Sequence, residues 1–200
     1  MDTELTFRIA FWALFAGVII LRLYFSMRVR RSGERLMPDR QAIRREGVGS
    51  FIARVVLFFC LIGWLILYAI YPPWMASISF ILPAWLRWVG FVLGAGSLAL
   101  WIWTQSTLDT LWSAQLQLRP EHHLVTNGPY AHIRHPLYAA MILLSIAFSL
   151  VTANWFFILL SALAILGMIV RVPREEQMMI EHFGREYQTY MHQTGRFFPR

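Results

Sequence analysis

The sequence predicts an all-α fold: a multi-pass bundle of about five transmembrane helices that forms a single membrane domain over residues 1–200. Two observations lead to this prediction. Of the 200 residues, 58% are hydrophobic and 14% are charged, whereas a soluble domain carries roughly 25% charged residues. The apolar residues are also gathered into long stretches, and a helix needs about 20 such residues to cross the hydrocarbon core of a bilayer.

Five apolar stretches are the expected spans. Three lie within residues 1–106, at 7–25, 51–71 and 84–106. Two shorter ones lie within residues 107–200, at 137–150 and 155–170, on either side of a break at residues 152–154. We interpret these two as a helical hairpin, because tilt of the helices and local thinning of the bilayer can absorb the missing length. In the third stretch Gly90 and Gly94 form a G-x-x-x-G pattern, which favours close helix packing within the bundle.

The arginines predict the orientation of the bundle. Residues 26–50, 107–136 and 171–200 all carry arginine, whereas the connection at 72–83 and the turn of the hairpin carry no charge. By the positive-inside rule the three basic segments face the cytoplasm and the N-terminus lies outside. The basic residues are all arginines, spread over membrane-proximal loops. Contact with anionic membrane lipids therefore explains the net charge of +7 better than binding of nucleic acid does.

The segment 122–138, with the sequence HHLVTNGPYAHIRHPLY, is too polar and irregular to span the membrane. Its residues 127–129 predict a turn. Pro136 holds His135 in an extended or turn-like conformation and suits the first turn of the helix that follows. Non-helical backbone at membrane depth is tolerated where it is buried in protein or lines a cavity, so the segment indicates a pocket for a ligand.

A metal site is the competing interpretation, because four histidines cluster in this segment: His122, His123, His132 and His135. However, the chain has no H-E-x-x-H pattern, and no cysteine joins the cluster. We therefore expect no metal. For His132, an ordinary surface position without a role stays an open interpretation.

A second polar cluster, RVPREE, begins at Arg171, at the end of the last apolar stretch. Arg171 and Glu175 are four residues apart and would share one face of a helix, either as an ordinary salt bridge or as a binding pair. In the second interpretation Arg171 binds an anionic group of a substrate, because its planar donors match a carboxylate, while Glu175 meets a cationic group. Glu176 points elsewhere on the helix and need not share this role.

The tail after Pro173 predicts an amphipathic helix. Met179, Phe183, Tyr187 and Tyr190 recur at helical spacing, and charged residues lie off that stripe. We expect this helix to lie along the cytoplasmic face of the bundle or the lipid interface, where its aromatic stripe packs and could close the pocket.

Together these polar positions resemble the isoprenylcysteine carboxyl methyltransferase family. The shared pattern is H-x-L-V-T-x-G-x-Y-x-x-x-R-H-P-x-Y, then two hydrophobic stretches, then R-x-x-x-E-E and F-G-x-x-Y-x-x-Y. In this chain it falls on His122, Leu124, Val125, Thr126, Gly128, Tyr130, Arg134, His135, Pro136, Tyr138, Arg171, Glu175, Glu176, Phe183, Gly184, Tyr187 and Tyr190. The resemblance covers about the C-terminal half of the chain, and the N-terminal helices match only in being apolar.

The resemblance implies an integral-membrane methyltransferase that uses S-adenosylmethionine and releases S-adenosylhomocysteine. It also implies a cofactor pocket that faces the cytoplasm and is formed by the loop and the final helices. Carried over residue by residue, the cofactor-binding residues would be Gln115, His122, His123, Leu124, Val125, Tyr130, His135, Pro136, Leu137, Tyr138 and Glu175. Arg171 would bind the carboxylate of the substrate, and Arg171 and Glu175 would be the catalytic pair.

The chemistry of these residues is compatible with that implication. A sulfonium methyl donor is already activated, so the protein mainly has to position two reactants. A carboxylate is ionised at neutral pH and needs an orienting cation rather than a general base. We therefore expect O-methylation of a lipidic, prenylcysteine-like substrate that enters from the membrane.

Three other functions stay open at this point. The methyl acceptor could be another lipidic or small group, such as a phospholipid amine or a thiol, whose deprotonation would require a base. A membrane reductase is a second class, since sterol reductases have a related C-terminal arrangement, although the sequence has no nicotinamide-binding signature. The third class is a non-catalytic membrane scaffold with a vestigial cofactor pocket.

Overall fold

The computed structural model describes residues 3–31, 48–108 and 124–200. These residues form helices and no regular strand. The α-helices are α1 (Thr3–Arg31), α3 (Val48–Ile70), α4 (Ala84–Leu108), α5 (Pro136–Thr152), α6 (Trp155–Phe183) and α7 (Arg185–Gln193). Two short 3-10 helices also occur, η1 (Pro73–Ile78) after α3 and η3 (Gly128–Ala131) before α5.

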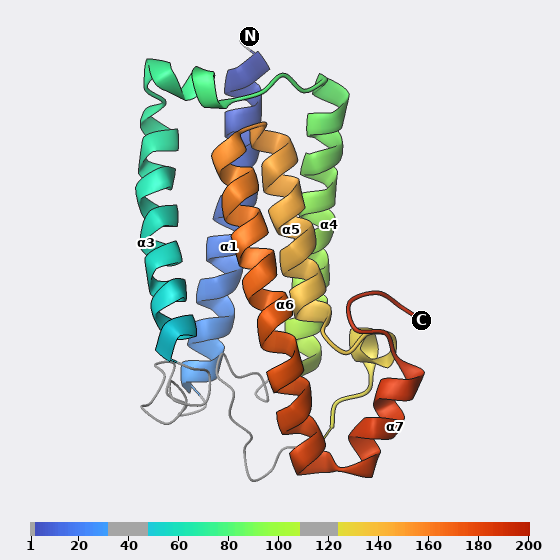
Figure 1. Ribbon diagram of the computed structural model, residues 1–200. Helices are drawn as coiled ribbons and strands as arrows, with labels where there is room; N and C mark the ends of the chain where they lie inside the picture. Colours follow the sequence, from blue (N-terminus) through green and yellow to red (C-terminus); the bar gives the residue numbers. More distant parts are fainter. Residues whose placement is uncertain (1–2, 32–47, 109–123) are drawn as a thin grey trace.

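The long helices stand side by side in an upright bundle (Figure 1). Helices α5 and α6 lie at its centre, α4 flanks α5, and α3 stands at the opposite edge. By length and composition, α1, α3, α4 and α6 can each cross a membrane, and α5 is a shorter apolar helix of 17 residues. The predicted all-α membrane fold is confirmed, with an apolar helix at each of the five expected places.

The two ends of the bundle differ in the way the loop charges predict. The N-terminus, the connection from α3 to α4 and the turn between α5 and α6 lie together at the end drawn at the top of Figure 1, which we call the upper end. The ends of α1, α4 and α6, the starts of α3 and α5, and helix α7 lie toward the lower end. The described parts of the three basic segments therefore gather at the lower end. Which side of the membrane that end faces stays a prediction.

The turn between α5 and α6 depends on two buried residues. Ala153 adopts the left-handed conformation, with a φ of 48°, and ends α5. Asn154 caps α6, because its Oδ1 accepts a hydrogen bond of 3.0 Å from the amide of Phe156. The same side chain donates to Ser79 Oγ at 3.3 Å, which ties the hairpin to the connection between α3 and α4. The predicted break at residues 152–154 falls at Ala153 and Asn154, because Thr152 is still the last residue of α5.

Helix α6 extends well beyond its predicted end. The sequence predicted a short span at residues 155–170, but the helix continues through Pro173 to Phe183. A proline inside a helix removes one hydrogen bond and costs about 3 kcal/mol. The helix continues because Val172 and Glu176, on either side of this proline, are both buried against the rest of the protein. At Gly184, with a φ of 55°, the helix finally ends.

The C-terminal tail consequently forms the end of one helix and a second, separate helix. Gly184 separates Phe183, the last residue of α6, from α7. Helix α7 is the predicted amphipathic helix: its Tyr187 and Tyr190 are buried, while charged residues such as Glu186 are exposed. A single stripe from residue 179 to residue 190 was predicted, and the glycine turn divides it because it redirects the chain.

Helices α4 and α5 pack closely through the G-x-x-x-G pattern. A Cβ at Gly90 would lie 2.6 Å from Leu150 Cβ and 3.2 Å from the backbone oxygen of Ala147. Gly94 faces Ala147 as well, and also Leu14 of α1. The predicted use of these glycines for packing within the bundle is confirmed.

Gly90→Ala is expected to destabilise the protein by about 1–3 kcal/mol, because the backbone of α5 must shift to admit the added methyl group. Gly96→Ala is the matched control on the same helix. A Cβ there meets nothing within 4 Å, and a helical Gly→Ala exchange stabilises by about 0.5–1 kcal/mol. Thermal unfolding of the detergent-purified variants measures both effects. A midpoint for Gly90→Ala at or above that of the unmodified protein would contradict the close packing.

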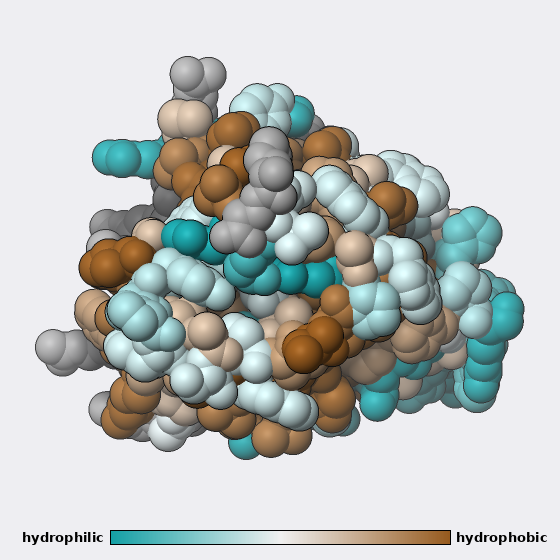
Figure 2. All heavy atoms as spheres, turned by 90° about the horizontal axis from the view of Figure 1, so that it is seen from above, coloured by the Kyte–Doolittle hydropathy of each residue, from teal (hydrophilic) through white to brown (hydrophobic). Residues whose placement is uncertain are grey.

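A partly buried ion pair at the upper end was not predicted. On α4, Arg87 donates two hydrogen bonds, of 2.7 and 3.2 Å, to the carboxylate of Glu4 on α1. Its Nε donates to the carbonyl of Val151 on α5 at 2.9 Å, and its guanidinium lies 4.0 Å from the centre of the Phe7 ring. These contacts join α1, α4 and α5. Figure 2 shows this end, with hydrophilic groups near the middle of a largely aromatic and apolar face.

Candidate functional site

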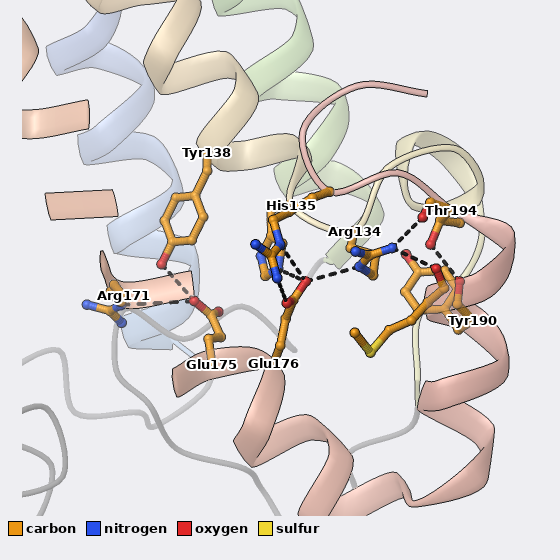
Figure 3. A network of polar contacts seen from close by, with 10 residues as sticks. Arg134, His135, Tyr138, Arg171, Glu175, Glu176, Tyr190 and Thr194 are labelled. Carbon is orange, nitrogen blue, oxygen red and sulfur yellow. Dashed lines mark hydrogen bonds and ion pairs between the residues drawn. The ribbon is translucent and has the colours of Figure 1, made fainter. Parts of the chain in front are cut away.

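The polar residues singled out in the sequence meet at the lower end of the bundle (Figure 3). Arg171, Glu175 and Glu176 are carried by the second half of α6. His135 and Tyr138 approach them from the start of α5. The two polar clusters, which are far apart in the sequence, are thus brought together in space.

The loop before α5 turns sharply at Gly128. This residue has a φ of 56°, and a Cβ on it would lie 2.8 Å from Thr107 Oγ1 at the end of α4, so glycine lets the loop approach this helix. The turn predicted at 127–129 is confirmed, since η3 begins there. His135 follows in a non-helical conformation and Pro136 begins α5, as predicted.

The last residues of the chain run alongside this loop. The amide of Arg134 donates to the carbonyl of Gly195 at 2.9 Å, and the amide of His135 donates to the carbonyl of Arg196 at 3.1 Å. In return, the amide of Gly195 donates to the carbonyl of His132 at 3.2 Å. The C-terminal segment is therefore part of the site, which the sequence did not predict.

Glu176 is the centre of the polar network and is only 3% exposed. Its Oε1 accepts hydrogen bonds from Arg134 Nε at 3.1 Å and from Arg196 Nε at 3.2 Å, and it lies 3.3 Å from His135 Nε2. Its Oε2 accepts from Arg196 Nη2 at 2.5 Å. A buried carboxylate requires such partners. Glu176 thus points away from Arg171, as predicted, but it points into a buried contact that holds three chain segments together.

Further hydrogen bonds fasten α7 to the same loop. Arg134 Nη1 donates to the carbonyls of Met191, at 2.9 Å, and Thr194. Tyr190 Oη donates to the carbonyl of Tyr130 at 2.6 Å. Burial raises the pKa of Tyr190 to about 12 and also raises the pKa of Tyr130. Both phenols therefore stay protonated at neutral pH and can act as hydrogen-bond donors.

A second polar group forms around Glu175, the residue before Glu176 in α6, and lies on the neighbouring face of that helix. Tyr138 Oη donates to Glu175 Oε2 at 2.7 Å, and Arg171 Nε lies 4.0 Å from the same oxygen. The second distance fits an ion pair but is too long for a hydrogen bond. The Arg171 and Glu175 side chains are 23% and 30% exposed, so both are half-buried on one face of the helix, as the spacing predicted. The ring of His135 stacks on that of Tyr138 and links this group to Glu176.

This second group combines opposite charges within an aromatic setting. The carboxylate of Glu175 can attract a cation, and the guanidinium of Arg171 can bind a carboxylate through two parallel hydrogen bonds. Tyr138 orients the carboxylate. The arrangement suits ligands that bring one cationic and one anionic group to the same place.

The predicted site residues have different outcomes. Those with contacts in the two groups are Tyr130, His135, Tyr138, Arg171 and Glu175. Pro136 and Leu137 begin α5, and Leu137 packs against the apolar cluster that contains Trp101. Leu124 and Val125 are half-buried in the irregular segment that leads to η3. Gln115, His122 and His123 lie outside the described residues. The binding roles of all these residues stay predictions.

The described residues include no group of three or more His, Cys, Asp or Glu side chains that could hold a metal ion. Because His122 and His123 lie outside that part of the chain, the expectation of no metal stays a prediction.

Sequence reasoning missed the C-terminal partners of the network, Thr194, Arg196 and Phe197, the last of which packs against His135. A signal was available in the second glutamate of the E-E pair. A charged residue this close to the membrane needs a partner, and the tail carries arginines that could supply one.

Comparison with known proteins bears on the family. A family model described as the isoprenylcysteine carboxyl methyltransferase (ICMT) family matches residues 88–181. The chain is 33% identical over 98 residues to the nickel-cobalt-cadmium resistance protein NccN of Alcaligenes xylosoxydans xylosoxydans, a match that covers 48% of this chain and 46% of that protein. It is 31% identical over 137 residues to the cobalt-zinc-cadmium resistance protein CzcN of Cupriavidus metallidurans, covering 64% and 62%. The chain thus spans about half to three-fifths of the length of these relatives.

Among solved structures, the eukaryotic intramembrane Ras methyltransferase ICMT matches with a TM-score of 0.51 and 24% identity, over 82% of this chain and 54% of that chain. This similarity shows a shared fold. The family match covers η3, α5 and most of α6, the elements that carry Tyr138, Arg171 and Glu175. The resemblance noted in the motifs is confirmed: residues 88–181 are similar to the isoprenylcysteine carboxyl methyltransferase family, and the chain shares the helical membrane fold of that solved structure.

Proposed function

We propose that this protein is a membrane methyltransferase that uses S-adenosylmethionine to O-methylate the carboxylate of a membrane-embedded, prenylcysteine-like substrate. The observation that carries the proposal is the group formed by Arg171, Glu175 and Tyr138. It places a half-buried cation and a half-buried anion on one helix face, within the segment that matches the family model.

The residues present fit a sulfonium cofactor. Glu175 supplies a negative charge, and Tyr138 contacts it directly. Tyr130 lies close enough that the charge of Glu175 contributes to raising its pKa. A carboxylate beside aromatic rings is a favourable environment for a cation. When bound, S-adenosylmethionine supplies an activated methyl group, whose carbon leaves the sulfur while the bonding electron pair stays on the sulfur.

The residues of this chain would act mainly by position and charge. Arg171 would bind the acceptor carboxylate and orient one of its oxygens, and no general base is needed because the carboxylate is already ionised at neutral pH. Glu175, held by Tyr138, would offset the positive charge of the donor. Because one helical turn separates Arg171 from Glu175, the two reactants would be held at a fixed distance, which lowers the entropic cost of the reaction.

The surroundings of Arg171 support a lipidic acceptor. Exposed apolar side chains follow α6 through the membrane toward Arg171: Leu163, Leu166, Ile169 and Val170. A hydrocarbon chain can lie along this surface while a polar head group reaches the arginine. The hydrophilic cofactor would enter from the lower end, which faces the cytoplasm if the positive-inside rule holds.

A methyl-transfer assay tests this function. The protein, purified in detergent, is incubated with S-adenosylmethionine carrying a labelled methyl group and with N-acetyl-S-farnesylcysteine. We expect a base-labile methyl ester on the farnesylated compound. The matched control is the same compound with a carboxamide in place of the carboxylate, which should accept no methyl group. Transfer to a phospholipid amine or a thiol, with none to the acid, would contradict the proposed acceptor.

A further inference from the structure

Helix α4 carries a buried polar stripe that the site described above does not use. Trp101, Thr104 and Gln105 are 5%, 0% and 3% exposed. Residues three and four apart are neighbours on a helix surface, so these three side chains lie on one side of α4. Within the described part of the chain, Trp101 Nε1, Thr104 Oγ1 and Gln105 Oε1 are buried without a hydrogen-bond partner.

The stripe lies between the upper packing surface of α4 and the loop that carries the site. Trp101 packs against Ala140 of α5. About one turn above it, Ser97 Oγ donates to the Ala140 carbonyl at 2.7 Å, so this hydroxyl is satisfied. Below the stripe, Thr107 of the same helix approaches the loop at Gly128. Trp101 at one end of the stripe therefore faces α5, and the other end of the stripe lies one turn from the contact with the loop at Gly128.

The three unpartnered polar atoms of the stripe are unfavourable in a buried position. A polar atom that loses water and gains no hydrogen bond destabilises the folded protein, and the penalty is larger within a membrane. Thr107, which is only half-buried, donates to the Trp103 carbonyl at 2.9 Å, whereas the fully buried Thr104 hydroxyl has no partner among the described residues. Apolar residues pack against the cluster that contains Trp101, among them Leu137 and Met141. A ligand group is the kind of partner that would compensate three such atoms at once.

We propose that Trp101, Thr104 and Gln105 form a subsite for an uncharged hydrogen-bonding group of the ligand, such as an amide or a hydroxyl. The indole N–H and the threonine hydroxyl can donate, and the glutamine carbonyl oxygen can accept. The stripe contains no ionisable side chain, so it matches a neutral group. This inference rests on the proposed function. The neutral group belongs either to the acceptor, as an acyl amide, or to the cofactor, as the ribose and adenine groups.

The direction in which Thr104→Val changes the thermal stability tests whether the stripe lacks a hydrogen-bond partner in the ligand-free protein. Thr104→Val removes only the hydroxyl and keeps the shape of the side chain. In the ligand-free protein we expect its midpoint of thermal unfolding to rise, by about 2–4 °C, because an uncompensated polar atom is lost. Ser97→Ala is the matched control: it removes a satisfied hydroxyl from the same face of the same helix, and its midpoint should fall. A fall for Thr104→Val as well would overturn the proposal.

The same variants are then tested for ligand binding. Thr104→Val and Gln105→Met should each weaken a ligand by about tenfold, which corresponds to one hydrogen bond, while Ser97→Ala should not. The probes are S-adenosylhomocysteine in calorimetry and N-acetyl-S-farnesylcysteine in the methyl-transfer assay. Weaker S-adenosylhomocysteine binding would assign the subsite to the cofactor. A higher KM for the farnesylated acid alone would assign it to the acceptor.

Two negative results are distinguishable. If the unmodified protein is active and both variants retain its affinity and KM, the subsite is wrong while the proposed function stands. If the unmodified protein binds neither probe, the proposed function fails and the subsite fails with it.

Discussion

Arg171→Ala is expected to lower kcat/KM for a carboxylate acceptor by about 30–100-fold while leaving the KM for S-adenosylmethionine nearly unchanged. A hydrogen-bonded contact between charged groups contributes about 2–3 kcal/mol, and each 1.4 kcal/mol corresponds to about tenfold. The kcat/KM of Arg171→Lys should lie between the values of the unmodified protein and of Arg171→Ala, because lysine keeps the charge but lacks the planar pair of donors. Steady-state kinetics with N-acetyl-S-farnesylcysteine measures these values.

Two variants make this result specific. Glu175→Gln should instead raise the KM for S-adenosylmethionine, because it removes the charge that faces the donor. Arg185→Ala removes an exposed arginine of α7 and should change neither parameter. If Arg171→Ala impaired only the cofactor, or if both Arg171→Ala and Glu175→Gln kept full activity, the assignment of the two residues would be wrong.

Glu176→Ala is expected to destabilise the protein by about 3–5 kcal/mol, because it leaves Arg134 and Arg196 facing each other without their common carboxylate. The C-terminal segment should detach first, because Arg196 loses its hydrogen bonds to both carboxylate oxygens of Glu176. Chemical unfolding in mixed micelles gives the free energy, and limited proteolysis near residue 195 reports the detachment.

The control for this variant is Glu181→Ala on the same helix. Glu181 is exposed and accepts one hydrogen bond of 3.0 Å from Gln177, so its loss should change stability by no more than about 0.5 kcal/mol. Equal stability of the Glu176 and Glu181 variants would show that the buried carboxylate does not hold the C-terminal segment.

The helices of the bundle could be predicted because apolar stretches and breaks are local features of the sequence. Asn154 interrupts the apolar stretches and is a favourable cap for the helix that follows, and Gly90 marks a close helix contact. The end of α6 could not be predicted in the same way. Pro173 is a local signal to stop, but tertiary burial of Val172 and Glu176 outweighs it.

The site was predictable as two clusters but not as one network. Arg171 and Glu175 were found because their spacing of four is a helical signal. The partners of Glu176 were missed because Arg134 and Arg196 reach it only after the chain has folded, from two separate segments. The Glu4–Arg87 pair was not predicted for the same reason, because it joins the first helix to the middle of the chain.

The most direct measurement is calorimetric titration of the detergent-purified protein with S-adenosylhomocysteine. We predict saturable binding, markedly weakened in His135→Ala, whose ring lies between Glu176 and Tyr138. The folded state of both samples is checked by thermal unfolding. No binding to the well-folded, unmodified protein would contradict the methyltransferase function and favour a reductase or a non-catalytic scaffold.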